Sequence, residues 1–318
     1  MKAIICREYG SADVLQLQEV EKPVPKENEI LVRVHSTAVN SADWRLRKAE
    51  PAAVRLFFGL TKPRKGILGG VFSGAVEAVG KGVTRFKVDD LLYGSTGMRL
   101  GAYAEYICLS EKGAIVTKPK NMSFEEAVSI PFGGLTALHF LKKARVEKRQ
   151  SIFIYGASGA VGTMAVQLAK YFEAEVTGVC STANLDLVTS LGADYVIDYT
   201  QEDVASSGRS YDIIFDTVGK MSFSASKKLV KKEGIIILGS SNVSKEIQGV
   251  WTSISSSRKV ISGVASEKAD DLIFLKELIE QGYIKPVIDK NYKLEEIPNA
   301  HRYVEQGHKK GNVVITII

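Results

Sequence analysis

The sequence predicts an α/β protein of two domains, one a mostly antiparallel β domain and the other a doubly wound parallel sheet. Roughly the first 120 residues consist of short strand-like stretches separated by glycine, proline and charged turns. From residue 151 onward, six apolar runs alternate with helical patterns, which is typical of a doubly wound sheet. A chain of 318 residues is long enough to form two hydrophobic cores.

The first domain is predicted to include both ends of the chain. Its strand-like stretches occupy residues 2–6, 14–20, 29–39, 71–80, 89–94 and 102–109. Beyond residue 266, an amphipathic helix is followed by short strands that end in "NVVITII", and this pattern matches the N-terminal part. We therefore expect residues 1–122 and 266–318 to form the β domain, and residues 123–265 to form the second domain.

The second domain is predicted to begin with a helix, because Ser123 and Glu126 have the spacing of a capping box. The apolar runs lie at 151–155, 175–180, 195–199, 211–218, 234–240 and 259–265. The helical patterns lie at 160–172, 182–193, 201–207 and 220–232. This alternation predicts that the strands pair in parallel.

The stretch "SIFIYGASGAVG", Ser151 to Gly162, predicts a strand, a tight turn and the start of a helix. It is close to the G-x-G-x-x-G pattern of dinucleotide sites, with Ala157, Gly159 and Gly162 at the three glycine positions. Gly156 and Ala157 would make the turn, and Gly159 would let the backbone approach a pyrophosphate. Gly162 would let the helix pack tightly on the sheet. A purely structural glycine turn is the alternative.

The strand before this turn and the helix after it favour a dinucleotide site. Backbone amides at the start of the helix would face an anion, and the helix dipole would favour that anion. The residues that supply these amides are Ser158, Gly159, Ala160 and Val161.

The end of the second apolar run, "EVTGVCSTANLD", indicates which dinucleotide is preferred. A site for NAD places Asp or Glu here to hold the ribose 2′-hydroxyl. This chain has Cys180, Ser181 and Thr182, and the first acid is Asp186. Small hydroxyl groups would accept a 2′-phosphate that a carboxylate would repel. We therefore expect NADPH, with Ser181 and Asn184 on the phosphate side.

Composition argues against several classes of partner. The net charge is +6, but the lysines and arginines lie in short groups mixed with acids and without interleaved aromatic residues, so we expect no nucleic-acid partner. No stretch is long and apolar enough to span a membrane, and we expect no membrane partner. Three widely spaced cysteines are typical of reduced thiols, so we expect a cytoplasmic protein.

Motifs along nearly the whole chain resemble one family. They are "AVNSADWRLR", "FSGAVEAVGKGVTRFKVDD", "SIPFGGLTALHFL", "IYGASGAVGTMAVQLAK", "SLGADYVIDY", "FDTVG" and "GNVVITII". Together they are similar to medium-chain dehydrogenases/reductases of the zinc-free quinone oxidoreductase type. The resemblance implies a GroES-like β domain, made from both chain ends, and a Rossmann domain. It also implies a homodimer.

The resemblance implies roles for individual cofactor-binding residues. The glycine turn would hold the pyrophosphate, and Ser181 would hold the 2′-phosphate. Tyr199, in "VIDY", corresponds to a family residue that helps to hold the adenosine phosphate. Thr136 would lie near the nicotinamide ribose, and Gly239 and Asn312 near the nicotinamide half.

Two residues of "VNSADWR" are our candidates for catalysis. Asn40 corresponds to a position at the active-site end of the family's β domain, where it would orient the nicotinamide or donate to the substrate oxygen. Arg45 stands where some quinone reductases carry a tyrosine, and it would offer a cation to negative charge that develops on the substrate. A surface arginine is the alternative for Arg45.

The nearest rival is a zinc alcohol dehydrogenase. Zinc relatives supply a cysteine in the segment occupied here by "AVNSADW" and a His-Glu pair in the segment occupied by "GGVFSG", and this chain has neither. Three distant cysteines cannot form a four-cysteine structural site, and the four histidines form no pair at ligand spacing. We therefore expect no metal.

Without a metal to polarise an alcohol, reduction of an electron-poor acceptor is the favoured chemistry. The expected activity is transfer of a hydride from NADPH to a quinone or an α,β-unsaturated carbonyl. A third hypothesis is an NADPH-binding protein with a structural or sensing role, because fold alone does not define function.

Overall fold

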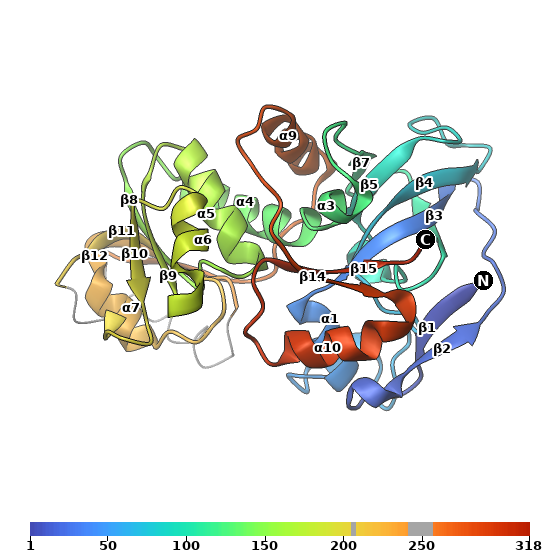
Figure 1. Cartoon of the computed structure of the whole chain (residues 1–318), viewed down its shortest axis with the longest axis horizontal. Helices are drawn as coiled ribbons and strands as arrows, with labels where there is room; N and C mark the ends of the chain where they lie inside the picture. The colour runs from blue at the N-terminus through green and yellow to red at the C-terminus, as the bar shows by residue number, and fades with distance from the viewer. Residues whose placement is uncertain (205–207, 241–256) are drawn as a thin grey trace. The chain divides into compact units, whose positions relative to one another are not determined.

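The computed structural model describes residues 1–204, 208–240 and 257–318 (Figure 1). The chain forms two compact units. The first contains Met1–Phe132 and Glu267–Ile318, and the second contains Gly133–Ser266. The division between them falls inside helix α4 (Pro131–Ala144).

The first unit is built on a seven-stranded sheet of order β14-β15-β3-β4-β5-β7, in which β6 also pairs with β3. All its pairs are antiparallel except β14 with β15. Strands β1 and β2 form a separate antiparallel pair. The bounds are β1 Lys2–Cys6, β2 Leu15–Glu19, β3 Glu29–Val39, β4 Val71–Val79, β5 Leu91–Ser95, β6 Tyr106–Ser110, β7 Ile115–Thr117, β14 Ile288–Lys293 and β15 Asn312–Thr316.

The last strand of the chain lies in the sheet of the first unit. Strand β15 pairs antiparallel with β3, and Val313 lies opposite Val39. Buried Val and Ile side chains on both strands supply the core here. The pairing therefore brings residues from opposite ends of the sequence side by side.

Helices complete the first unit. Helix α3 begins at the predicted capping box, where the Glu126 N–H donates to Ser123 Oγ and the Ser123 N–H donates to Glu126 Oε2. Helix α10 packs against α1, and α9 packs against β7. The bounds are α1 Ser41–Lys48, α2 Val54–Phe58, α3 Phe124–Val128, α9 Ala269–Glu280 and α10 Ile297–Glu305, with short 3₁₀ turns at Ala12–Val14, Gly97–Arg99 and Leu294–Glu296.

The second unit confirms the predicted doubly wound parallel sheet. Its six strands are all parallel and have the order β10-β9-β8-β11-β12-β13. The order reverses between β8 and β11, and such a reversal creates a binding crevice at the carboxyl ends of the strands. The bounds are β8 Ser151–Tyr155, β9 Glu175–Cys180, β10 Tyr195–Asp198, β11 Tyr211–Asp216, β12 Val230–Leu238 and β13 Lys259–Ile261.

Helices α5 (Ala160–Tyr171) and α6 (Leu185–Ser190) pack against β8, β9 and β10, whereas α7 (Phe223–Leu229) packs against β11 and β12 (Figure 1). A 3₁₀ turn, η3 (Thr182–Asn184), precedes α6. Apolar side chains from these strands and from α7 form the core of the sheet.

Two predicted helices differ from the structure. The helix predicted over residues 220–232 ends at Leu229 in the structure. The next residue, Val230, begins β12, which pairs with β11 through a register shift. Residues 201–204 form no α-helix, and 205–207, the rest of that predicted element, lie outside the described residues.

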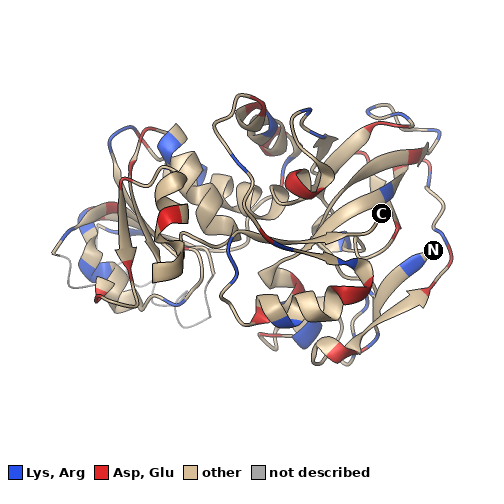
Figure 2. Cartoon of the chain, in the orientation of Figure 1, with Lys and Arg blue, Asp and Glu red and all other residues tan. Residues whose placement is uncertain are grey.

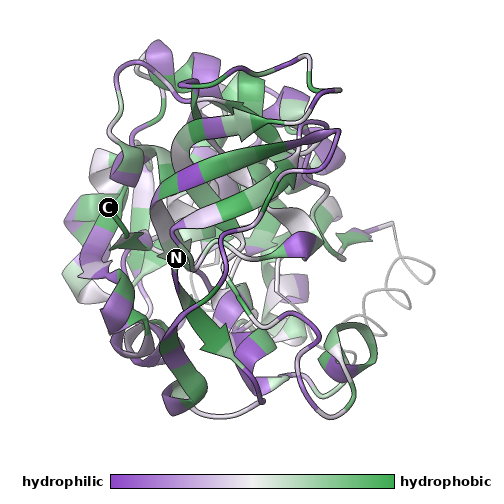
Figure 3. Ribbon diagram, turned by 90° about the vertical axis from the view of Figure 1, so that its right-hand side faces the viewer, coloured by the Kyte–Doolittle hydropathy of each residue, from purple (hydrophilic) through white to green (hydrophobic). Residues whose placement is uncertain are grey.

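Charges of both signs are scattered over the elements of each unit (Figure 2). Several strands of the first unit are coloured as hydrophobic along much of their length (Figure 3). In the described part of the chain, no helix is long and apolar enough to cross a membrane. Cys6, Cys108 and Cys180 are buried free thiols.

Candidate functional site

The turn between β8 and α5 has the geometry predicted from its glycines. Gly156 has a φ of +81°, in the left-handed region that favours glycine. Its N–H and that of Ala157 both donate to the Val179 carbonyl, so the turn is fixed to the neighbouring strand β9. The chain then enters α5 with Gly159 as the N-cap residue.

Gly159 and Gly162 have different surroundings in the fold. A Cβ on Gly162 would overlap the carbonyl oxygen of Gly156, so the close approach of helix and turn needs this glycine. A Cβ on Gly159 would meet only the Gly156 oxygen at 3.6 Å, and Gly159 has an ordinary φ of −80°. The fold itself does not require glycine at 159. The space beside its backbone fits a ligand that approaches closely.

The start of α5 fits an anion. Because Gly159 has no side chain, no side chain caps the helix. The first N–H groups of a helix have no partner inside the helix, and the helix dipole makes this end positive. Gly133, on α4, packs so closely that a Cβ there would overlap the Ala160 carbonyl oxygen. Thr136 lies one turn further along α4 and is half-buried.

Ser181 follows β9 at the same sheet edge. It is the N-cap residue of η3, but its side chain makes no capping hydrogen bond there. Instead, Asn184 Nδ2 donates to Ser181 Oγ over 3.1 Å. The Ser181 oxygen therefore acts as an acceptor, and no described residue accepts its hydroxyl proton, which can donate to a phosphate.

The sequence analysis missed an acid near this position. Asp198 ends β10 and lies opposite Cys180 of β9. Its carboxylate accepts the hydroxyl of Thr182 and both the N–H (2.9 Å) and the hydroxyl (2.7 Å) of Thr200. The hydrogen bond from Thr182 and those from Thr200 lower the pKa of Asp198. Asp198 comes close to Ser181 only because β10 pairs with β9, and this pairing cannot be inferred from the spacing of the residues in the sequence.

The remaining predicted residues of the second unit lie at the carboxyl ends of its strands. Tyr199 follows β10, and its ring lies 6.2 Å from that of Tyr155 at the end of β8. Gly239 follows β12 and donates its N–H to the Asp216 carbonyl, and a Cβ there would press on Phe215. The structure therefore places the glycine turn, Ser181, Tyr199 and Gly239 along one sheet edge.

In the first unit, the structure brings Asn40 and Asn312 together. Asn40 follows β3 and Asn312 begins β15, and the register that pairs Val39 with Val313 places the two asparagines opposite each other. Both are 2% exposed. The Asn312 amide donates to the Val287 carbonyl. Among the described residues, the Oδ1 atoms of both asparagines are buried and lack a hydrogen-bond partner.

A buried amide oxygen without a partner costs free energy, and such groups in native proteins usually have a ligand or water as partner. Two of them, on residues that lie opposite each other in the register of β3 and β15, therefore mark a place where a polar ligand group would be accepted. Arg45 lies on α1, five residues after Asn40, and is half-buried, with its guanidinium 5.4 Å from the Trp44 ring.

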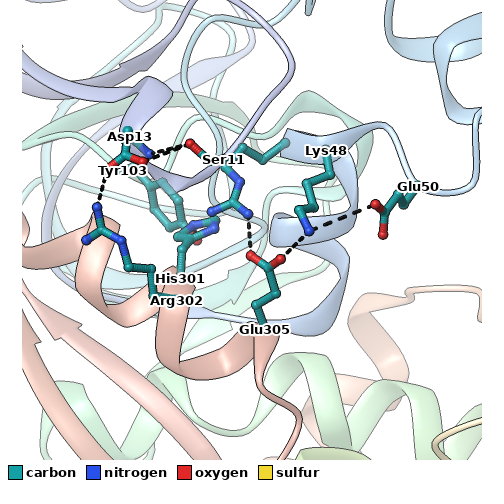
Figure 4. A network of polar contacts seen from close by, with 9 residues as sticks. Ser11, Asp13, Lys48, Glu50, Tyr103, His301, Arg302 and Glu305 are labelled. Atoms are coloured by element: carbon teal, nitrogen blue, oxygen red, sulfur yellow. Dashed lines mark hydrogen bonds and ion pairs between the residues drawn. The ribbon is translucent and has the colours of Figure 1, made fainter.

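Helix α1 is held by a buried polar network that the sequence analysis did not find. Asp43 accepts the Asn40 N–H at 2.7 Å and also the Tyr103 hydroxyl. The Tyr103 hydroxyl contacts His301 Nε2 at 3.1 Å, and His301 belongs to α10. Figure 4 shows Tyr103 and His301 facing each other beside α10. Asp43 and Arg47 are four residues apart, which places them on one face of α1. This spacing is the feature of the sequence that could have indicated the network.

Arg47 and Lys48 complete the link between α1 and α10. Arg47 is fully buried, and its Nη2 lies 2.6 Å from the Glu305 carboxylate. Lys48 pairs with the same carboxylate (Figure 4). Removing Glu305 would leave the buried Arg47 charge without this partner, which is strongly destabilising. The pair therefore fixes α1, which carries Asn40 and Arg45.

Burial shifts two pKa values in this network in opposite directions. Desolvation raises the pKa of Asp43 to about 7, against hydrogen bonds that lower it. Desolvation, together with the nearby charge of Arg47, lowers the pKa of His301 to about 3. His301 is therefore neutral near pH 7 and acts as a hydrogen-bonding group.

Histidine, cysteine and acidic side chains do not gather into a group of three or more that could hold a metal, within the described ranges. His35 stacks on Phe124 with ring centroids 4.1 Å apart, and His139 Nδ1 accepts the Ser266 N–H. Both histidines therefore have structural contacts.

Two family models match the chain. The model "Alcohol dehydrogenase GroES-like domain" matches residues 26–120, and the model "Zinc-binding dehydrogenase" matches residues 191–315. The first covers much of the first unit. The second covers part of the parallel sheet and continues to the last strand.

Individual relatives match along almost the whole chain. A 2-methylene-furan-3-one reductase of Solanum lycopersicum is 32% identical over 99% of this chain and 79% of its own length. An NADPH-dependent alkenal/one oxidoreductase of Arabidopsis thaliana is 30% identical over the same shares. The solved structure of a quinone oxidoreductase from Coxiella burnetii has a TM-score of 0.91 and 29% identity, and the match covers 100% of this chain and 99% of that one.

The names of these relatives are all those of reductases or oxidoreductases, and the Coxiella burnetii structure shares the fold of this protein along its whole length. The chain is an oxidoreductase and belongs to the medium-chain dehydrogenase/reductase family, among members that resemble quinone oxidoreductases.

Proposed function

We propose that the protein is an NADPH-dependent reductase that transfers a hydride to a quinone or an α,β-unsaturated carbonyl, without a bound metal. The observation that carries this proposal is the arrangement of groups at the carboxyl ends of the strands of the parallel sheet. There, an uncapped helix start lies beside an open Gly159, and Ser181 has a free hydroxyl proton. The names of the relatives support both the cofactor and the substrate classes.

The residues of the second unit fit NADPH. The room beside Gly159 and the first N–H groups of α5 suit a pyrophosphate, as expected for Ser158, Gly159, Ala160 and Val161. The Ser181 hydroxyl suits a 2′-phosphate, and Asn184 orients it by donating to its oxygen. When bound, NADPH supplies the hydride.

We assign the polar groups of the first unit to the other half of the reaction. The unpaired Oδ1 atoms of Asn40 and Asn312 suit the N–H donors of a carboxamide group. The Arg45 guanidinium suits negative charge that grows on the substrate oxygen as the acceptor is reduced. The proton that completes the reduction comes from water.

The donor set supports a reaction without metal. A catalytic zinc needs three protein ligands from Cys, His and acidic residues, and the described residues do not bring three such side chains together. The lack of such a set of side chains among the described residues therefore argues against a zinc alcohol dehydrogenase.

An acceptor panel tests the proposal. We expect quinones and enones, but not simple alcohols, to support turnover, measured as loss of the absorbance of reduced nicotinamide. A chelator should leave this turnover intact, and elemental analysis should find no stoichiometric zinc. Tight NADPH binding without turnover on any acceptor would favour the structural or sensing role. One tightly bound zinc per chain would favour the alcohol dehydrogenase.

We further propose that the first unit is the substrate domain and the second the dinucleotide-binding domain. A homodimer is proposed from the family resemblance. A cytoplasmic location is proposed because the three cysteines are buried, unpaired thiols.

A further inference from the structure

The segment that follows α1 exposes large apolar side chains. Leu56 is 66% exposed, Phe57 is 73% exposed and Leu60 is 64% exposed. They lie within five residues of one another, on α2 and directly after it. Single exposed apolar residues are normal on a protein surface, but a group of three large ones marks an interaction site.

This segment has a fixed conformation with its apolar side chains outward. Phe58 packs against the core cluster of the first unit, and the Tyr9 hydroxyl donates to the Gly59 carbonyl at 2.7 Å. The Arg64 N–H donates to the Phe58 carbonyl at 2.7 Å, which closes the loop after α2. The anchors therefore hold Leu56, Phe57 and Leu60 next to one another in solvent.

The same segment is strongly basic. Arg55, Lys62, Arg64 and Lys65 are exposed, and no acid occurs between Pro51 and Val76. Arg55 lies over the Tyr9 ring, 5.0 Å from its centroid, and so belongs to the anchored part. The segment therefore carries four exposed cations together with three exposed apolar side chains. We call the segment 51–65 the apolar-basic segment.

We propose that the apolar-basic segment docks the protein on the surface of an anionic lipid bilayer. Leu and Phe side chains enter the boundary between headgroups and acyl chains, while Lys and Arg keep their charges at the headgroups. Anionic headgroups attract nearby Lys and Arg side chains, so an anionic bilayer is complementary in charge to this basic segment. The docking is peripheral, and it replaces the sequence-based expectation that there is no membrane partner.

Charge argues against a second copy of the chain as the occupant. In a two-fold interface the same patch meets itself. The four cations of one apolar-basic segment would then face the four of the other, and no acid within the segment would compensate them. An anionic surface removes this repulsion.

Sedimentation of the full-length protein with lipid vesicles tests the proposal. The vesicles are phosphatidylcholine alone, or phosphatidylcholine with about a third phosphatidylglycerol. We expect binding to the anionic vesicles only, weakened by salt because screening reduces the attraction. The double variants Leu56→Ser/Phe57→Ser and Lys62→Glu/Arg64→Glu should each lower the partition coefficient by about tenfold or more.

Matched controls change similar groups elsewhere. Val24→Ser removes an apolar side chain that is 82% exposed, and Lys227→Glu/Lys228→Glu reverses two exposed charges on α7. These variants should bind vesicles like the wild type. Turnover with a water-soluble acceptor should be the same in all variants, which separates docking from the enzyme activity.

Three results would overturn the proposal. The first is equal binding of the wild type to both kinds of vesicle, or no binding to either. In the second, the segment variants change the mass of the assembly in analytical ultracentrifugation, while the wild type ignores vesicles. This would assign the segment to self-association. In the third, turnover with the soluble acceptor falls without any vesicle binding. This would assign the segment to substrate access.

Discussion

At the scale of single residues, we attribute the cofactor preference to the hydroxyl groups of Ser181 and Thr182, only one of which already donates a hydrogen bond within the protein. The Thr182 hydroxyl donates to Asp198 and is committed. Ser181 accepts from Asn184, so its own proton remains available. Of the two neighbouring hydroxyl groups after β9, we therefore propose Ser181 as the donor for a 2′-phosphate.

Ser181→Asp should reverse the cofactor preference. A carboxylate in place of the hydroxyl repels the 2′-phosphate and accepts from the 2′-hydroxyl of NADH. We expect NADPH affinity to fall by about tenfold or more, with NADH affinity kept or improved, since a hydrogen bond to a charged group is worth about 1.5–3 kcal/mol.

The measurement is the dissociation constant of each cofactor for the wild type and the variant. Thr182→Val is the matched control, because it removes a hydroxyl that already donates to Asp198. It should change the ratio of the two constants less than Ser181→Ala does. A wild type that binds NADH as tightly as NADPH would rule out this account of Ser181.

Asn40→Ala and Arg45→Ala should lower kcat while leaving NADPH affinity almost unchanged. Asn40 has a buried amide oxygen without a partner, and Arg45 supplies a cation on the same helix. Losing the Arg45 cation, which stabilises developing charge, should cost a factor of about 10²–10³ in kcat. Losing the Asn40 acceptor should lower kcat because the nicotinamide is less well oriented. Steady-state kinetics with a good acceptor, together with cofactor titration, measures both. Unchanged turnover in both variants would remove these residues from the reaction.

At the scale of secondary-structure elements, the turn from β8 into α5 combines a structural glycine with a functional one. Gly162 is required by the contact with Gly156, whereas Gly159 has room for a side chain in the protein alone. The two positions therefore separate stability from binding.

Gly162→Ala should destabilise the protein by about 1–3 kcal/mol, the usual cost of overpacking. Gly159→Ala should cost less, about 1 kcal/mol or below, because glycine is preferred to alanine at an N-cap. It should weaken NADPH binding by about tenfold or more, because the methyl group occupies the space for the pyrophosphate. Urea unfolding and cofactor titration of both variants check this. If Gly159→Ala binds NADPH normally, the pyrophosphate does not lie at this turn.

Helix α1 depends on its polar contacts with α10. His301 is neutral in the folded protein because burial lowers its pKa to about 3. In the unfolded chain a histidine is protonated below about pH 6.5. The folded state therefore loses stability from this group as pH falls from 6.5 towards 3. The raised pKa of Asp43 has the opposite effect, because the folded state keeps that proton as pH rises towards 7.

His301→Gln should remove the histidine contribution and leave that of Asp43. Glutamine can still contact Tyr103, but it does not titrate. On lowering the pH from about 7 to about 5, the wild type should lose roughly 2 kcal/mol more stability than the variant. Urea unfolding at both pH values measures this difference. Parallel losses in the two proteins would show that His301 is not buried as a neutral group.

At the scale of the whole molecule, the parallel sheet was predictable because its signals are local. The glycine turn and the apolar runs each lie within a short stretch of chain. The prediction from sequence was wrong where strand pairing outweighed the local helical pattern. The helix predicted to continue to residue 232 ends at Leu229, because the following residues extend β12 beside β11.

The polar networks were not predictable, because they join residues that are distant in the chain. Tyr103 and His301 are separated by 198 positions, and Asp198 reaches Thr182 only through the pairing of β9 and β10. The opposition of Asn40 and Asn312 likewise depends on the register of β3 with β15. Sequence indicated the residue types at the site, and strand register determined which of them meet.

The central claim is that this chain moves a hydride from NADPH to an electron-poor carbon without a metal. NADPH that carries deuterium at the transferring nicotinamide position tests it most directly, with an enone as acceptor and protein treated with chelator. The account predicts a saturated ketone with deuterium at the former β-carbon, formed in step with NADPH consumption. A product without deuterium, or activity that returns only when zinc is added, would contradict it.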